Sequence, residues 1–196
     1  MVFLKDMEVF LVELKETRLR GETVYSGKIL TVQKDVVTLP NGAKACREVV
    51  RHNGACCVVA IDDEKNLFLV RQFRYALNKE FLELPAGKLD VIGESPLEAA
   101  QRELFEETGV KASNWIDLGT IYPSPGYCDE VIYLYVATDL IQEDSLHLDE
   151  GEFLQVEKYS LDEIFEEILY GTIRDSKTIC AILKLKMLMI EGKIEI

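Results

Sequence analysis

Long apolar runs and clusters of basic residues are both missing from this sequence of 196 residues. No apolar stretch approaches the roughly 20 residues that a helix needs to cross a bilayer. The formal net charge is −13, from 35 acidic against 22 basic residues, so a long polyanion would be repelled. Residues 1–19 also lack the uninterrupted apolar core of a signal peptide. We therefore expect a soluble cytoplasmic protein that binds neither membranes nor nucleic acid.

Cysteine and histidine are scarce, which limits the redox and metal chemistry of the chain. The five cysteines are Cys46, Cys56, Cys57, Cys128 and Cys180, an odd number without any C-x-x-C spacing, so neither a disulfide framework nor a zinc site is indicated. Cys56 and Cys57 are adjacent, so on a strand they face opposite sides of the sheet. The two histidines accompany no recognisable nucleophile motif. We expect free thiols and no histidine-based catalysis.

The first 50 residues differ in pattern from the rest of the chain. Short β-rich pieces are predicted at Thr23–Tyr25, Lys28–Val32, Asp35–Leu39 and Ala45–Val50, separated by glycine and by Pro40-Asn41-Gly42. These pieces predict a small antiparallel segment over residues 1–50, too short to bury an adequate core alone. The continuous apolar run Ala55–Ile61 predicts a strand buried on both faces. We place the main domain at residues 51–196.

Two capping boxes mark the starts of helices in the main domain. Ser95 suits an N-cap position, with Pro96 in the first turn and Glu98 as the reciprocal partner, and Gly109 supplies a left-handed stop. Ser160 begins a second helix in the same way, and an amphipathic helix is predicted over residues 177–191. Helices alternating with strands predict an α/β or α+β sandwich, with a mixed sheet between helices.

Three glutamates gather on one face of the first helix. Glu103, Glu106 and Glu107 are three and four residues apart, so their carboxylates repel one another unless they are compensated. A solvated acidic face is the ordinary interpretation of such a pattern. Here only Arg102 is near enough in sequence to neutralise them, and further acids precede the helix. Clustered hard oxygens are typical ligands of Mg²⁺, with Mn²⁺ as the alternative.

Residues 87–110, GKLDVIGESPLEAAQRELFEETGV, closely resemble the Nudix box of hydrolases that act on nucleoside diphosphates linked to another moiety. From Glu94 onward every motif position matches. One departure precedes it, because six residues separate Gly87 from Glu94 where the family has five. The extra residue falls in a loop, where an insertion costs little.

The resemblance implies a Nudix sandwich and a set of metal ligands. Glu103 and Glu107 would bind Mg²⁺ directly, Glu106 would contribute to a second ion, and the Ala86 backbone carbonyl would be a further ligand. Arg102 would orient the glutamates. The resemblance therefore assigns Glu106 and Arg102 to catalysis.

A second resemblance, to ADP-ribose pyrophosphatases, depends on a proline sixteen residues beyond the box glycine, the spacing of Pro125 from Gly109. It implies hydrolysis of ADP-ribose to AMP and ribose 5-phosphate. Arginine forks can grip phosphate oxygens, although arginines in such positions are more often in surface ion pairs. In the resembling enzymes the position of Glu83 helps to hold the terminal ribose. The candidate substrate-binding residues are Arg51, Arg71, Arg74, Glu83 and Pro125.

The general base and the quaternary structure follow from the same resemblance. The base would come from the loop Glu143–Glu152, with Glu152 as the best match and Glu150 as the alternative. A homodimer is implied, in which the N-terminal segment reaches the substrate site of its partner. Two other functions remain open: a pyrophosphatase for another nucleoside diphosphate sugar, such as ADP-glucose or GDP-mannose, and a Nudix-fold sensor that binds ADP-ribose without cutting it.

Overall fold

The computed structural model describes residues 13–143, 148, 151 and 153–196, and the chain divides into two compact units. The first unit is Met1–His52 together with Gly126–Asp129. The second unit is Asn53–Pro125 together with Glu130–Ile196. The division falls two residues beyond the boundary expected from the sequence, and residues 126–129 join the N-terminal unit.

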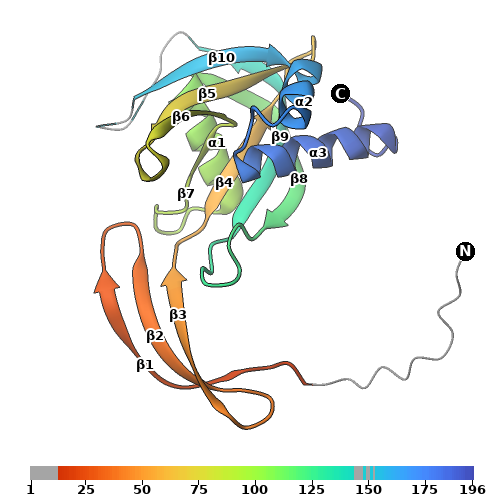
Figure 1. The fold of residues 1–196 in the computed structure, drawn as a ribbon. Helices are drawn as coiled ribbons and strands as arrows, with labels where there is room; N and C mark the ends of the chain where they lie inside the picture. Colours follow the sequence, from red (N-terminus) through yellow and green to blue (C-terminus); the bar gives the residue numbers. More distant parts are fainter. Residues whose placement is uncertain (1–12, 144–147, 149–150, 152) are drawn as a thin grey trace, which may run out of the picture. The chain divides into compact units, whose positions relative to one another are not determined.

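The first unit is a three-stranded antiparallel sheet in the order β1-β2-β3 (Figure 1), formed by Thr17–Ser26, Thr31–Thr38 and Lys44–Arg51. The prediction of two separate strands at Lys28–Val32 and Asp35–Leu39 was wrong, because the single strand β2 begins at the end of the first piece and continues through most of the second. Gln33 and Lys34 lie between them and keep their register with β1 and β3. Their side chains point to opposite faces of the sheet, and neither is buried, so two polar residues are tolerated inside the strand.

Residues 126–129 are attached to the end of β3. The Val50 amide donates to the Tyr127 carbonyl at 2.7 Å, and the His52 amide donates to the Asp129 carboxylate at 2.9 Å. Arg51 also forms an ion pair with Asp129 at 2.9 Å. These contacts explain why this short segment belongs to the N-terminal unit.

The second unit contains two sheets (Figure 1). The four-stranded sheet has the order β7-β4-β9-β8, in which β4 and β9 are parallel and the other pairs are antiparallel. The three-stranded sheet has the order β10-β5-β6 and is antiparallel, and a 3-10 turn, Tyr75–Leu77, links β5 to β6. The strands are β4 (Ala55–Ala60), β5 (Asn66–Arg74), β6 (Lys79–Glu83), β7 (Ala86–Lys88), β8 (Val110–Ile121), β9 (Ile132–Gln142) and β10 (Leu154–Ser160).

The helices α1 (Pro96–Thr108), α2 (Leu161–Leu169) and α3 (Ser176–Ile190) begin where their capping residues indicate. Both predicted capping boxes are present, at Ser95 and at Ser160. Gly109 ends α1 with a φ of 68°, in the left-handed region that favours glycine. The predicted boundaries of these helices are therefore confirmed to within a residue or two.

Strand β4 lies at the centre of the core and packs on both faces. On one face Cys57 belongs to a buried cluster with Ile182 and Leu185 of α3. On the other face Cys56 packs with Ala100 and Leu104 of α1. The mixed sheet therefore lies between helices, as predicted for a sandwich. All five cysteines are free, and no helix in the described part of the chain is long and apolar enough to span a membrane.

Candidate active site

Arg102 lies at the centre of a group of carboxylates on α1 and in the loop before it, which we call the Arg102 cluster: Arg102, Glu94, Glu103 and Glu106. Its Nε and Nη2 donate to Glu94 at 2.9 and 3.0 Å. Its Nη1 donates to Glu103 at 2.8 Å and to Glu106 at 2.9 Å. These contacts, led by the hydrogen bond to Glu94, raise the pKa of Arg102. One guanidinium thus contacts three carboxylates, and the structure brings Arg102 together with Glu103 and Glu106.

Glu107 is separated from the Arg102 cluster and points into the protein. Its side chain accepts a hydrogen bond of 3.0 Å from the Ala86 amide in β7, and the residue is only 5% exposed. The sequence grouped it with Glu103 and Glu106 on one acidic face, whereas the structure buries Glu107 and leaves the other two half-buried. Glu107 therefore connects α1 to the strand that carries Ala86.

Gly87 brings the backbone of β7 against Glu103. A Cβ atom at position 87 would overlap the Glu103 carboxyl group, so any larger residue would displace this carboxylate. The Cys56 thiol contacts the Gly87 carbonyl at 3.6 Å, and burial raises the pKa of Cys56 to about 12, so the thiol is protonated and donates. Carboxylates of α1 thus meet β7 at the adjacent residues Ala86 and Gly87.

The donor atoms at this junction fit a divalent cation that prefers oxygen. In the residues that the structure describes, no three acidic, histidine or cysteine side chains converge as a ready-made metal cage. Mg²⁺ does not require one, because it commonly keeps several waters and binds through one or two carboxylates together with substrate phosphate. Glu103 lies against Gly87 and Glu107 against Ala86, so two carboxylates are available at consecutive residues of β7.

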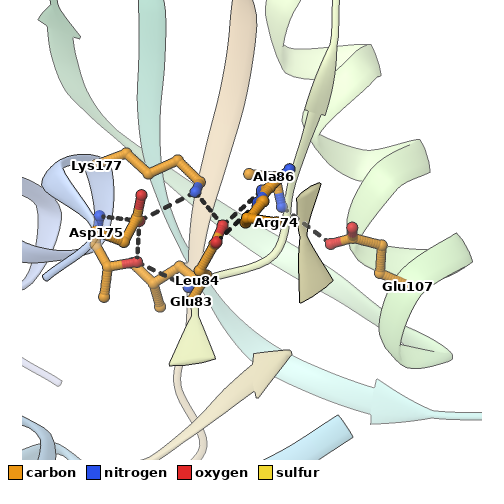
Figure 2. Close-up of polar contacts among 8 residues, drawn as sticks. Arg74, Glu83, Leu84, Ala86, Glu107, Asp175 and Lys177 are labelled. Atoms are coloured by element: carbon orange, nitrogen blue, oxygen red, sulfur yellow. Dashed lines mark hydrogen bonds and ion pairs between the residues drawn. The ribbon is translucent and has the colours of Figure 1, made fainter. Parts of the chain in front are cut away.

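A second group of charged residues, the Glu83 cluster, lies nearby at the end of β6 and consists of Glu83, Arg74, Lys177 and Asp175 (Figure 2). Arg74 donates from Nε at 2.8 Å and from Nη2 at 2.6 Å to Glu83. Lys177 contacts both carboxylates, at 3.0 Å for Asp175. Burial by itself raises the pKa of Glu83, but the hydrogen bond from Arg74 and the charge of Lys177 outweigh it and lower the pKa.

A cavity of about 310 Å³ opens beside Glu107. It is lined by Gln72, Phe73, Glu107, Gly151, Phe153 and Leu154. An adjoining cavity of about 430 Å³ shares four of these residues. The sequence analysis missed Phe73 and Phe153 as lining residues. Phe73 could have been noticed because it lies between the two arginines already selected.

The other predicted site residues are more dispersed. Arg71 of β5 forms an ion pair with Glu157 of β10. Glu157 also accepts a hydrogen bond from Tyr159 of the same strand. Arg51 lies in the first unit, where it is paired with Asp129. Pro125 is exposed in the turn after β8. Glu152, the predicted base, and its alternative Glu150 lie outside the described residues.

Several known proteins are similar to this chain over most of its length. A methanol dehydrogenase activator from Bacillus methanolicus is 42% identical over 174 residues, which is 88% of this chain and 94% of the relative. An ADP-ribose pyrophosphatase from Bacillus subtilis (strain 168) is 38% identical over 175 residues, covering 89% of this chain and 94% of the relative. The crystal structure of an ADP compounds hydrolase has a TM-score of 0.80 and 29% identity, covering 92% and 97% of the two chains.

The family assignment depends on a match that includes both charged clusters. The NUDIX domain family matches residues 50–181, a range that contains the whole box, β7 and the first turn of α3. This match confirms the resemblance found between Gly87 and Val110. The chain therefore belongs to the NUDIX family.

Proposed function

We propose that this protein is a Mg²⁺-dependent pyrophosphatase that hydrolyses ADP-ribose to AMP and ribose 5-phosphate. The observation that carries the proposal is the pair of carboxylates, Glu103 and Glu107, that meets Gly87 and Ala86 at the edge of a cavity. Relatives named ADP-ribose pyrophosphatase support this substrate, one of them from Mycobacterium tuberculosis at 38% identity over 165 residues. That relative is covered over 79% of its length.

The proposed metal ligands are Glu103, Glu106, Glu107 and the carbonyl of Ala86. When bound there, Mg²⁺ would neutralise phosphate oxygens and lower the pKa of the attacking water, and Mn²⁺ could replace it. Arg102 would keep Glu103 and Glu106 in the orientation that the structure shows. The three α1 carboxylates would otherwise repel one another.

Substrate phosphates require positive groups, because the protein as a whole is acidic. Arg74 uses Nε and Nη2 for Glu83, so we propose that a phosphate oxygen meets its Nη1. Arg71 has the same arrangement toward Glu157. Arg51, Glu83 and Pro125 complete the proposed substrate-binding set. Guanidinium groups held in this way can contact phosphate without losing much side-chain freedom on binding.

The proposed general base is Glu152, with Glu150 as the alternative. Its sequence neighbours Gly151 and Phe153 line the same cavity as Glu107, which supports this choice. The base would take a proton from the water that attacks one phosphorus of the pyrophosphate, and the bond to the bridging oxygen would break.

We also propose that the protein is a homodimer formed through its first unit. Every residue of β1 is exposed, including the apolar side chains Leu19, Val24 and Tyr25. An exposed edge with apolar side chains is typical of a surface that pairs with another chain. Light scattering coupled to gel filtration would give the mass of the particle, and a monomer at micromolar concentration would contradict this proposal.

A substrate panel tests the proposed activity. Purified protein with Mg²⁺ should convert ADP-ribose to AMP with a higher kcat/KM than ADP-glucose or GDP-mannose, and a chelator should abolish turnover. GDP-mannose belongs in the panel because a GDP-mannose pyrophosphatase from Cronobacter sakazakii is 30% identical over 159 residues. Absence of ADP-ribose cleavage with several divalent metals would refute the proposal. Binding without cleavage would instead favour a sensor.

A further inference from the structure

The first turn of helix α3 is fastened to the segment that links β6 to β7 (Figure 2). The Leu84 amide donates a hydrogen bond of 2.9 Å to the Thr178 hydroxyl. The Lys177 ammonium contacts the Glu83 carboxylate. Each contact joins residues that are 94 positions apart in the sequence. A distant part of the chain therefore holds the end of β6.

The linking residues Leu84 and Pro85 lead directly to Ala86, the first residue of β7 and the proposed carbonyl ligand, and all three consecutive residues are held by hydrogen bonds. Leu84 is fixed by Thr178 of α3. The Pro85 carbonyl accepts a hydrogen bond of 2.9 Å from the Val58 amide of β4. The Ala86 amide donates to Glu107 of α1. Helix α3 therefore holds one end of the stretch from Leu84 to Ala86, and helix α1 holds the other end.

Lys177 is an unusual residue to find in this position. Its side chain is only 10% exposed, and that of Glu83 is 2% exposed. A buried ammonium is strongly unfavourable unless charged partners surround it. Burial lowers the pKa of Lys177, but the charges of Asp175 and Glu83 outweigh burial and raise it, so the group is charged at neutral pH.

Asp175 fixes the direction of the Lys177 ammonium. Its Oδ2 accepts from the Thr178 amide at 3.0 Å and from the Thr178 hydroxyl at 2.6 Å, as the N-cap of α3. The same oxygen lies 3.0 Å from Lys177 Nζ. The ammonium is therefore held between a helix cap on one side and Glu83 on the other.

We propose that Lys177 is a positioning residue for pyrophosphate hydrolysis, an inference that rests on the function proposed above. Its ammonium holds the Glu83 carboxylate, and Glu83 in turn holds two nitrogens of Arg74, so that the remaining edge of the guanidinium is presented to a substrate phosphate. Lys177 does not itself contact the substrate. Its effect is on binding, through Arg74, rather than on the attacking water.

The test is Lys177→Met, which keeps an unbranched side chain as far as Cε and removes the ammonium group. We expect KM for ADP-ribose to rise about tenfold or more, the factor expected when a hydrogen bond to a charged group is lost, with a smaller change in kcat. The dissociation constant for ADP-ribose, measured by calorimetry with a chelator present, should rise by a similar factor. The same substitution in an Arg74→Ala background should have little further effect, because the two residues act in series.

Two further variants separate positioning from folding. Lys186→Met is the matched control, because Lys186 also lies on α3 and pairs with a carboxylate, Asp162, away from the site. It should leave KM unchanged. Asp175→Asn keeps a good N-cap residue and removes only the charge that faces Lys177, so it should raise KM in the same direction by a smaller factor. Urea unfolding shows whether each variant is folded under assay conditions.

The outcomes distinguish this inference from the proposed function. An unchanged KM and dissociation constant in folded Lys177→Met would overturn the positioning role while leaving the activity intact. Equal effects of Lys177→Met with and without Arg74 would also overturn it. If the wild type fails to cleave ADP-ribose, the proposed function is refuted. The dissociation constants of the wild type and of Lys177→Met for ADP-ribose then still decide whether Lys177 positions Arg74. A wild type that neither cleaves nor binds ADP-ribose refutes both.

Discussion

The Arg102 cluster and the Glu83 cluster are made of the same kinds of side chain but differ in their balance of charge. In the Arg102 cluster one guanidinium contacts three carboxylates, those of Glu94, Glu103 and Glu106. In the Glu83 cluster two cations, Arg74 and Lys177, face two carboxylates, Glu83 and Asp175. The first group therefore carries surplus negative charge, and the second is neutral.

The two clusters also differ in their access to solvent. Arg102 and Glu106 keep 27% and 28% of their side chains exposed. In the Glu83 cluster Lys177 and Glu83 keep only 10% and 2%, whereas Arg74, on the outer side, keeps 42%. A surplus of negative charge that solvent can reach attracts cations, so the Arg102 cluster is suited to binding a metal. The Glu83 cluster is neutral and its Glu83–Lys177 ion pair is buried, so it attracts no counterion, and removing either partner of that pair is costly. Substitutions should therefore act mainly on metal binding and kcat in the Arg102 cluster, and on stability and substrate binding in the Glu83 cluster.

The largest effect on stability is expected from Glu83→Gln. It leaves the buried Lys177 ammonium and the partly exposed Arg74 guanidinium without their shared carboxylate. Removing one partner from a buried ion pair typically lowers the free energy of unfolding by about 3–5 kcal/mol. Urea denaturation followed by circular dichroism would measure the loss, and a change below about 1 kcal/mol would show that the cluster is not structural.

The same variant has a pH dependence that serves as its control. The folded state lowers the pKa of Glu83 below its ordinary value of 4.5, so the carboxylate stabilises the fold above that pH. This contribution is lost as the pH falls through the folded-state pKa, because both states are then protonated. The difference in stability between the wild type and Glu83→Gln should therefore be constant near neutrality and shrink below pH 4.5. A difference that grows in acid would contradict the assigned direction.

The next effect is expected on catalysis, from Glu103→Gln in the other cluster. Loss of one carboxylate of the proposed metal site should reduce kcat by about 10²–10³-fold, as for other charge-stabilising groups. Stability should change by less than about 1 kcal/mol, because one hydrogen bond to Arg102 is lost while repulsion among the glutamates is relieved. Glu166→Gln, at an exposed position of α2, is the matched control and should keep full activity.

Features that depend on neighbouring residues were predictable from the sequence. The capping boxes at Ser95 and Ser160, the stop at Gly109 and the opposite faces of Cys56 and Cys57 all follow from local spacing. Each is set by backbone geometry within one turn or one strand. The sandwich fold and the family were predictable for the same reason, since the box is a continuous stretch of sequence.

Contacts between distant residues were not predictable. Nothing near Lys177 indicates that its ammonium meets Glu83, because 94 residues separate them and a lysine at the start of an amphipathic helix is ordinarily exposed. The inward direction of Glu107 was missed because helical spacing places it with Glu103 and Glu106. Its contact with the Ala86 amide depends on how β7 packs against α1. The spacing of residues within one helix does not show how that helix packs against a strand.

A smaller effect on metal affinity is expected from Gly87→Ala. The added methyl group would overlap the end of the Glu103 side chain, and a flexible carboxylate can move aside at little cost in stability. Its displacement should raise the Mg²⁺ concentration for half-maximal activity by about 10–100-fold, as when a metal ligand loses its orientation. Direct Mn²⁺ binding followed by electron paramagnetic resonance should weaken in parallel. Unaltered metal binding would show that Glu103 is not a ligand in this position.

The smallest effect is expected from Ser95→Ala, which tests how far the Arg102 cluster depends on the start of its helix. Ser95 accepts a hydrogen bond from the Glu98 amide and completes the capping box, so its loss should cost about 1 kcal/mol of stability. Ser160→Ala removes the equivalent cap from α2 and should cost a similar amount.

The two cap variants should nevertheless differ in activity. Glu94 directly precedes Ser95 and receives two hydrogen bonds from Arg102, so a frayed first turn loosens one side of the Arg102 cluster. Glu103 and Glu107 lie two and three turns farther along the helix and keep their contacts with β7. Ser95→Ala should therefore lower kcat by less than Glu103→Gln does, while Ser160→Ala leaves kcat unchanged. Equal kcat values for the two variants at equal stability would mean that Glu103 and Glu107 alone define the site, and that the pairing of Arg102 with Glu94 serves only the helix.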